Sequence, residues 1–173
     1  MGGAYFLASP PAKPLTPMGL RAPELVLSGT VNKTLDIWAW GCFIFELVTG
    51  ERLFCVAGGG FEDDDHLMAL TERPGPLPDE LFQKWENSSR YFTPDRKLFN
   101  SILELEEPEI LEQETMEEAF DLKAPELDAE EAAKVKALVQ RVLQYDPDKR
   151  PSPAELLRDP WFEETESQGG SSE

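Results

Sequence analysis

The sequence predicts a mainly α-helical protein with a single hydrophobic core. Residues 34–49 are apolar on every face of a helix, and 129–145 place apolar side chains three and four positions apart, which is the helical period. Prolines and glycines separate these segments from shorter ones, as in loops between helices. With 173 residues the chain is long enough for one domain with a sizeable core.

The composition excludes several classes of function. The chain carries 34 acidic and 16 basic residues and a formal net charge of −18, which argues against binding nucleic acid through its phosphates and permits a basic protein partner. Its longest run without a central charge, 37–45, is too short to span a membrane, and we see no secretory signal. Two cysteines without metal-ligand spacing indicate reduced thiols, so we expect an intracellular protein of the cytoplasm or nucleus.

The first half of the chain is expected to surround one core helix. Residues 1–20 are rich in proline and predict an extended loop. A helix over 34–49 that is apolar all round is typical of a fully buried core helix. Asp36 lies in its first turn, and Gly50 suits a left-handed C-cap.

Shorter helices follow. Asp63, Asp64 and Asp65 favour the start of a helix over 63–72, because acidic side chains suit the positive end of the helix dipole. Pro74-Gly75-Pro76 ends it, and Pro78 can open another short helix. Residues 86–127 are weakly patterned and acidic and predict loops with a short helix.

The C-terminal segment is the most clearly patterned. Residues 129–145 predict an amphipathic helix with Asp128 as its cap, and Asp146-Pro147 ends it. Ser152-Pro153-Ala154-Glu155 has the pattern of a capping box and opens a helix to about 158. Trp161 and Phe162 are expected to dock on the core, and 163–173 read as a disordered tail.

Three phrases, taken together, resemble the C-terminal lobe of eukaryotic protein kinases. They are Leu-Arg-Ala-Pro-Glu at 20–24, Asp-Ile-Trp-Ala-Trp-Gly-Cys at 36–42, and Asp-Pro-Asp-Lys-Arg-Pro-Ser at 146–152. The resemblance covers about 4–162, and its detail looks most like fungal relatives of the SR-protein-specific Ser/Thr kinases. It implies an incomplete kinase-like fold, the C-terminal lobe from the activation segment onward without the N-lobe sheet.

The resemblance also divides the chain. Residues 1–24 would be an activation-segment remnant with the substrate loop, and 25–162 the helices of the lobe with an acidic insert at about 100–127. The Gly-rich loop, strand Lys, His-Arg-Asp and Asp-Phe-Gly motifs that such kinases use for ATP and Mg²⁺ are not found in this sequence. We therefore expect no cofactor and no catalytic residue in this chain, although the full-length family uses ATP and Mg²⁺.

Two functions follow from the resemblance. The chain is either part of an ATP-dependent Ser/Thr protein kinase or a catalytically dead lobe that binds a basic protein; a third alternative is an independent acidic helical protein in which the motifs are accidental. The reading frame upstream of Met1 would distinguish the first two. In both cases the expected partner is a protein, basic or rich in Arg and Ser.

Part of the apolar surface of 37–48 would lose its cover in an isolated lobe, so we expect a monomer of marginal stability that tends to aggregate.

The resemblance assigns roles to two groups of residues. The substrate loop would contain Thr16, Pro17, Gly19, Leu20 and Arg21, and the structural motifs would contain Ala22, Pro23, Glu24, Asp36, Trp38, Gly41 and Arg150. Glu24 and Arg150 are expected to form a buried ion pair. Asp36 would be short of hydrogen-bond donors or exposed to solvent. Leu20 stands where a Tyr is common, so the substrate preference is open.

Four further features have alternative interpretations. Ser9-Pro10 and Thr16-Pro17 are either phosphorylation sites or ordinary loop residues. The acidic residues at 63–65 and 104–118 either hold Arg-rich substrates or are simply solvated. His66 is expected at the surface and not as a metal ligand. Cys42 is expected to be a core thiol.

Overall fold

The fold is mainly α, as predicted. The computed structural model describes residues 8–9, 16–56, 62–100 and 109–162. These ranges contain no β-strand, only isolated bridges that pair Phe92 with Leu98 and Phe99 with Ile110. The helices are α1 (Pro23–Ser28), α2 (Leu35–Thr49), α3 (Glu62–Glu72), α4 (Asp79–Phe82), α5 (Met116–Lys123), α6 (Ala129–Val142) and α7 (Pro153–Leu156), with 3-10 turns η1 (Met18–Leu20), η2 (Ser88–Arg90) and η3 (Pro147–Lys149).

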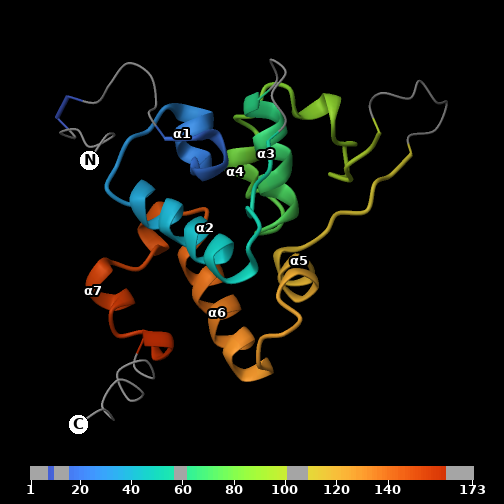
Figure 1. Cartoon of the computed structure of the whole chain (residues 1–173). Helices are drawn as coiled ribbons and strands as arrows, with labels where there is room; N and C mark the ends of the chain where they lie inside the picture. The colour runs from blue at the N-terminus through green and yellow to red at the C-terminus, as the bar shows by residue number, and fades with distance from the viewer. Residues whose placement is uncertain (1–7, 10–15, 57–61, 101–108, 163–173) are drawn as a thin grey trace, which may run out of the picture.

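Helix α2 occupies the centre of the molecule. In Figure 1 it runs between α1 and α3 above and α6 below, and it contacts α5, α6 and η1. Trp38 and Phe45 are fully buried, and the Phe45 ring meets Phe120 of α5 edge to face. A Cβ on Gly41 would lie 2.6 Å from Cγ1 of Val142, so this glycine permits the close approach of α6. The helix starts one residue after the predicted limit and ends at Gly50 with a φ of 73°.

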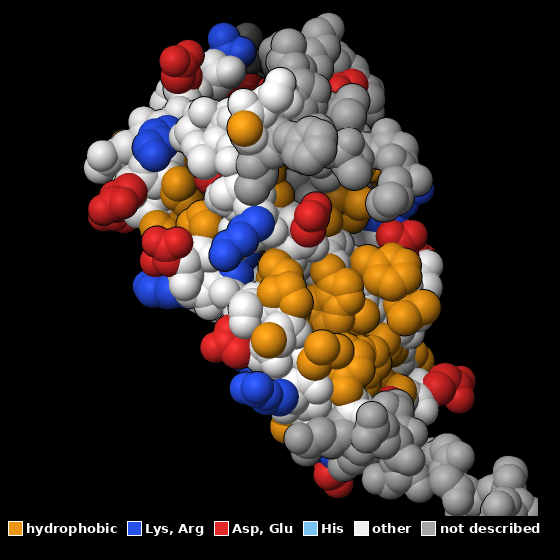
Figure 2. Space-filling view, turned by 90° about the vertical axis from the view of Figure 1, so that its left-hand side faces the viewer, with side chains coloured by type: hydrophobic (Ala, Val, Ile, Leu, Met, Phe, Trp, Pro, Cys, Tyr) orange, Lys and Arg blue, Asp and Glu red, His pale blue; other side chains and the backbone are white. Residues whose placement is uncertain are grey.

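One face of α2 is exposed to solvent, which contradicts the prediction of a fully buried helix. The side chains of Phe43 and Leu47 are 54% and 62% exposed, and Ile37 and Trp40 are half-buried. Figure 2 shows a broad patch of hydrophobic side chains on the face of the molecule that it presents. The helix is apolar all round, but its described neighbours cover only part of its circumference, in agreement with the expectation that part of the surface of 37–48 lacks cover.

Local signals set the ends of the other helices. Ser152 and Glu155 form the predicted capping box at the start of α7, which ends at Leu156 rather than near 158. Asp128 accepts hydrogen bonds from the N–H groups of Glu130 and Glu131 at the start of α6. Helix α6 ends at Val142, three residues before the predicted end, where Leu143 leaves the helical conformation with a ψ of 43°. Beyond the end of α6, the Gln144 carbonyl accepts from Nε of Arg150 at 2.8 Å, and the Tyr145 hydroxyl lies within hydrogen-bonding distance of the carbonyl oxygens of Leu70 and Gly75.

The C-terminal aromatic residues dock as expected. Trp161 and Phe162 are half-buried, and the Phe162 ring lies 6.2 Å from that of Trp40. The tail at 163–173, and the loop before residue 16 apart from Ala8 and Ser9, lie outside the described residues. None of the described helices combines the length and apolar character needed to cross a bilayer.

Candidate functional site

The predicted substrate loop, residues 16–21, is closed on itself by hydrogen bonds. We call it the 16–21 loop. The Leu20 N–H donates to the Pro17 carbonyl at 3.0 Å, and the Arg21 N–H donates to the Met18 carbonyl at 2.9 Å. The Arg21 side chain folds back, and its Nε donates to the Thr16 carbonyl at 2.9 Å. These bonds give a short loop a defined conformation.

Gly19 brings the 16–21 loop directly against the backbone of the segment that follows α2. A Cβ at Gly19 would lie 2.7 Å from the carbonyl oxygen of Phe54. A backbone atom cannot move aside as a side-chain end can, so this position requires glycine. The loop is thereby held against Phe54, which is buried.

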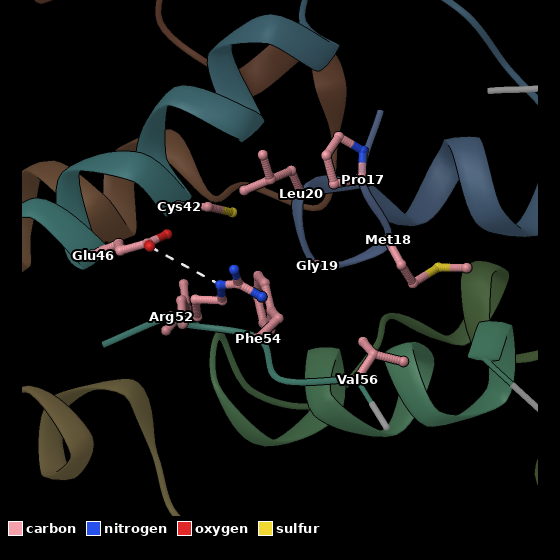
Figure 3. Close-up of a pocket in the computed structure, with 10 residues that line it drawn as sticks. Pro17, Met18, Gly19, Leu20, Cys42, Glu46, Arg52, Phe54 and Val56 are labelled. Atoms are coloured by element: carbon pink, nitrogen blue, oxygen red, sulfur yellow. Dashed lines mark ion pairs between the residues drawn. The ribbon is translucent and has the colours of Figure 1, made fainter. Parts of the chain in front are cut away.

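A cavity of about 310 Å³ opens beside the loop. Figure 3 shows the side chains around it: the 16–21 loop on one side, the C-terminal half of α2 on a second, and residues 52–56 on a third. Its wall is largely apolar, and its charged groups are Glu46 and Arg52, whose Oε1 and Nε atoms are 4.0 Å apart. Cys42 also lines the cavity. Burial raises the pKa of its thiol to about 12, so the thiol stays protonated, as expected for a core side chain.

The predicted ion pair is present immediately after the loop. Arg150 donates from Nη1 and Nη2 to the two carboxylate oxygens of Glu24 at 2.7 and 2.8 Å. Both side chains are buried, and the guanidinium lies 5.0 Å from the Trp38 ring. Arg150 Nη1 also reaches the Thr34 carbonyl at 3.3 Å. A bidentate charged pair with further acceptors satisfies the buried charges and fixes α1 to the C-terminal helices.

The remaining motif residues take structural positions. Ala22 and Pro23 are buried where α1 begins, and Gly41 packs against α6. Asp36 is exposed on α2, which is one of the two outcomes expected for it.

His66 contradicts the prediction of a surface histidine. Its side chain is fully buried on α3, and its Nε2 lies 2.8 Å from the Arg21 carbonyl oxygen. The His66 ring also meets the Phe54 ring edge to face at 5.4 Å. Sequence reasoning missed this because the acidic neighbours of His66 suggested a solvated helix end. The spacing of His66 and Leu70, both buried, is the helical signal that could have found it.

Asp64 is a second buried polar residue, and its burial contradicts the expectation that the acidic residues at 63–65 hold substrate or are solvated. Its carboxylate accepts from Trp85 Nε1 at 2.6 Å, Asn87 Nδ2 at 2.9 Å and the Tyr91 hydroxyl at 3.4 Å. It therefore ties α3 to the segment that follows α4. The three adjacent aspartates thus have different environments, since Asp63 is exposed, Asp65 is half-buried and Asp64 faces the interior.

Part of the acidic surface has structural partners. In the acidic stretch at 104–118, the described Glu114 pairs with Arg73, and Glu118 forms a capping box with Thr115 at the start of α5. Residues 101–108 lie outside the described part. On α3, Glu62 and Asp63 remain exposed next to the 16–21 loop, where Asp63 lies 3.9 Å from Arg21 Nη1. Among the described residues, no three His, Cys, Asp or Glu side chains are grouped closely enough to hold a metal ion.

Comparison with known proteins identifies related chains. Residues 13–162 match the model of the protein kinase domain family. The chain is 32% identical to "Serine/threonine-protein kinase SRPK" of Physarum polycephalum over 82% of its length and 32% of that protein. It is 30% identical to "Serine/threonine-protein kinase SKY1" of Saccharomyces cerevisiae over 84% of its length and 19% of that protein. It is 31% identical to human "SRSF protein kinase 3" over 82% of its length and 24% of that protein. The chain thus spans a third or less of these relatives.

Proposed function

The chain belongs to the protein kinase domain family and is similar to SR-protein kinases, and from this premise we propose that it is the substrate-binding part of an ATP-dependent Ser/Thr protein kinase. Its own role is to hold a basic, Arg- and Ser-rich protein segment against the 16–21 loop. ATP and Mg²⁺ belong to the full-length family, and this sequence carries none of the motifs that would hold them. No step of phosphoryl transfer is therefore assigned to its residues.

The observation that carries this proposal is the fixed geometry of the 16–21 loop. Gly19 packs on the Phe54 backbone, and the residues that follow the loop are locked by the Glu24–Arg150 pair. A loop held at Gly19 and directly after its C-terminal end can present the same surface to successive substrates, so little ordering entropy is lost on binding. The cavity beside it offers a largely apolar wall, and its two charged groups, Glu46 and Arg52, face each other at 4.0 Å.

The charge of the chain favours a basic substrate. The net charge is −18, and the exposed carboxylates of Glu62 and Asp63 lie on α3, which contacts η1 of the loop. Complementary charge raises the rate of encounter with an Arg-rich segment and disfavours acidic ones. The names of the SR-protein kinase relatives point to the same class of substrate.

Binding of a labelled peptide tests the proposal directly. We expect fluorescence anisotropy with the full chain to show saturable binding of an Arg-Ser repeat peptide and none of a Gly-Ser repeat. The Glu62→Gln/Asp63→Asn double variant should weaken the complex by about threefold to tenfold, since both are exposed and partly screened charges. The matched control is Glu126→Gln/Glu131→Gln, which removes the same charge at exposed sites on and before α6. Equal weakening by both variants, or no saturable binding, would contradict the proposal.

A further inference from the structure

We propose that His66 is a positioning residue that fixes the conformation of the 16–21 loop by donating a hydrogen bond from Nε2 to the Arg21 carbonyl. The inference rests on the substrate role proposed above for that loop. His66 does not line the cavity and would act on a bound peptide only through the loop.

The contacts of Arg21 show how one helix holds the loop. Asp63 and His66 are three residues apart on α3 and therefore lie on the same face. His66 Nε2 is 2.8 Å from the carbonyl oxygen of Arg21, and a carboxylate oxygen of Asp63 is 3.9 Å from its Nη1. The backbone and the side chain of one loop residue are thus both engaged by α3.

The hydrogen bond determines the state of the imidazole. A carbonyl oxygen can only accept, so Nε2 carries the proton, and in the neutral imidazole Nδ1 then has a bare lone pair. Nδ1 is buried and has no partner among the described residues. An imidazole at this position leaves one buried nitrogen unsatisfied, which costs free energy that a phenylalanine in the same apolar place would avoid. We infer that the donor function outweighs this cost.

The ring of Phe54 completes the support from the other side. Phe54 meets the His66 ring at 5.4 Å, and its own carbonyl oxygen is the atom that Gly19 approaches. The loop therefore lies between two fixed points, the Phe54 backbone at Gly19 and the His66 ring at Arg21. Loss of the His66 donor should release Arg21 at the end of the loop and leave Gly19 in contact with the Phe54 backbone.

Hydrogen exchange of the loop amides tests this without any substrate. Two variants make a matched pair: His66→Phe keeps a ring against Phe54 but cannot donate, whereas His66→Gln keeps a donor near the position of Nε2. We expect the Leu20 and Arg21 amides, which are hydrogen-bonded within the loop, to exchange about tenfold faster in His66→Phe, the factor that one lost hydrogen bond represents. In His66→Gln they should exchange at nearly the wild-type rate. Amides of α6 report global opening and should not change.

The possible outcomes separate this inference from the proposed function. Unchanged loop exchange in His66→Phe, equal acceleration of the loop and α6, or no recovery in His66→Gln would each overturn the positioning role. A long-range ¹H–¹⁵N spectrum that showed Nδ1–H in place of Nε2–H would do the same. If the wild-type chain fails to bind the Arg-Ser peptide, the proposed function fails, while the exchange data still decide what His66 does. If it binds, His66→Phe should weaken binding and His66→Gln should restore it.

Discussion

Arg150 and Glu24 are 126 residues apart in sequence, and their charged groups meet in two parallel hydrogen bonds of 2.7 and 2.8 Å. The pair is enclosed by Trp38 of α2 and by the carbonyl groups of Thr34 and Gln144. It therefore joins the start of α1, directly after the 16–21 loop, to the turn between α6 and α7.

Removing one partner of this pair should be strongly destabilising. Arg150→Met leaves the Glu24 carboxylate buried without its counter-charge, which costs about 3–5 kcal/mol in free energy of unfolding. The Glu24→Met/Arg150→Met double variant should lose less than the sum of the single losses, because no charge is left unpaired. Urea denaturation measures all three. Lys97→Met is the control: the side chains of Lys97 and Asp95 are 61% and 63% exposed, so their ion pair contributes at most about 1 kcal/mol. If Arg150→Met loses no more stability than Lys97→Met, the Glu24–Arg150 pair is not the buried ion pair described.

Gly41 should not tolerate even a methyl group. Gly41→Ala places a Cβ 2.6 Å from Cγ1 of Val142 and forces α2 and α6 apart, which should cost about 1–3 kcal/mol. Combining it with Val142→Ala removes the clashing methyl, so the double variant should be more stable than the sum of the two single losses predicts. Additive losses in urea denaturation would show that the glycine is not needed for this contact.

The two cysteines should differ in reactivity. Cys42 is buried and its thiol pKa is raised to about 12 by burial, whereas Cys55 is exposed. The thiolate is the reactive form, so we expect a thiol reagent to modify one cysteine in the native protein and two in denaturant. Cys55→Ser should abolish the native reaction. Rapid native modification of that variant would mean that Cys42 is accessible.

The exposed face of α2 should limit solubility more than stability. Phe43 and Leu47 are more than half exposed, so replacing both with Lys removes little buried apolar area. The Phe43→Lys/Leu47→Lys variant should reduce concentration-dependent aggregation, measured by light scattering, with an unfolding free energy within about 1 kcal/mol of wild type. A large loss of stability would indicate that this face is packed in the folded chain.

Much of this fold could be predicted because local signals specify it. The continuous apolar run gave the limits of α2 to within one residue, and Ser152 with Glu155 gave the cap of α7. The Glu24–Arg150 contact was predictable only from the resemblance, since nothing local links residues so far apart. The Thr115–Glu118 capping box has the same sequence pattern as that of α7 and was missed within an acidic stretch.

Contacts between distant segments account for what could not be predicted. Which of three adjacent aspartates turns inward depends on where Trp85, Asn87 and Tyr91 lie, and the composition of α3 does not contain that information. The burial of His66 likewise depends on the Arg21 carbonyl. The apolar pattern of α2 suggested that it is covered all round; that part of 37–48 lacks cover was expected only from the resemblance, because coverage depends on which neighbours surround the helix.

His66 should make folding stability depend on pH in a defined direction. Burial lowers the pKa of His66 below the ordinary 6.5, and the hydrogen bond to the Arg21 carbonyl partly offsets this effect. Two charged groups also act on the ring: the Arg21 guanidinium lowers its pKa, and the Asp63 carboxylate raises it. Below about pH 6.5 the imidazole takes up a proton in the unfolded chain but not in the folded one. The contribution of neutral His66 to the free energy of unfolding is therefore present above that pH. It decreases as the pH falls, by up to about 1.4 kcal/mol per pH unit.

His66 is the only histidine in the chain, so His66→Gln isolates its contribution to this pH dependence. We expect the urea midpoint of the wild type to fall between about pH 7 and pH 5.5 and that of His66→Gln to fall much less. Glu72, whose pKa is raised mainly by burial, titrates in both proteins and cancels in the comparison. Equal slopes for the two proteins would mean that His66 is protonated as readily in the folded chain as in the unfolded one. That result is incompatible with a neutral imidazole donating to Arg21 from a fully buried position.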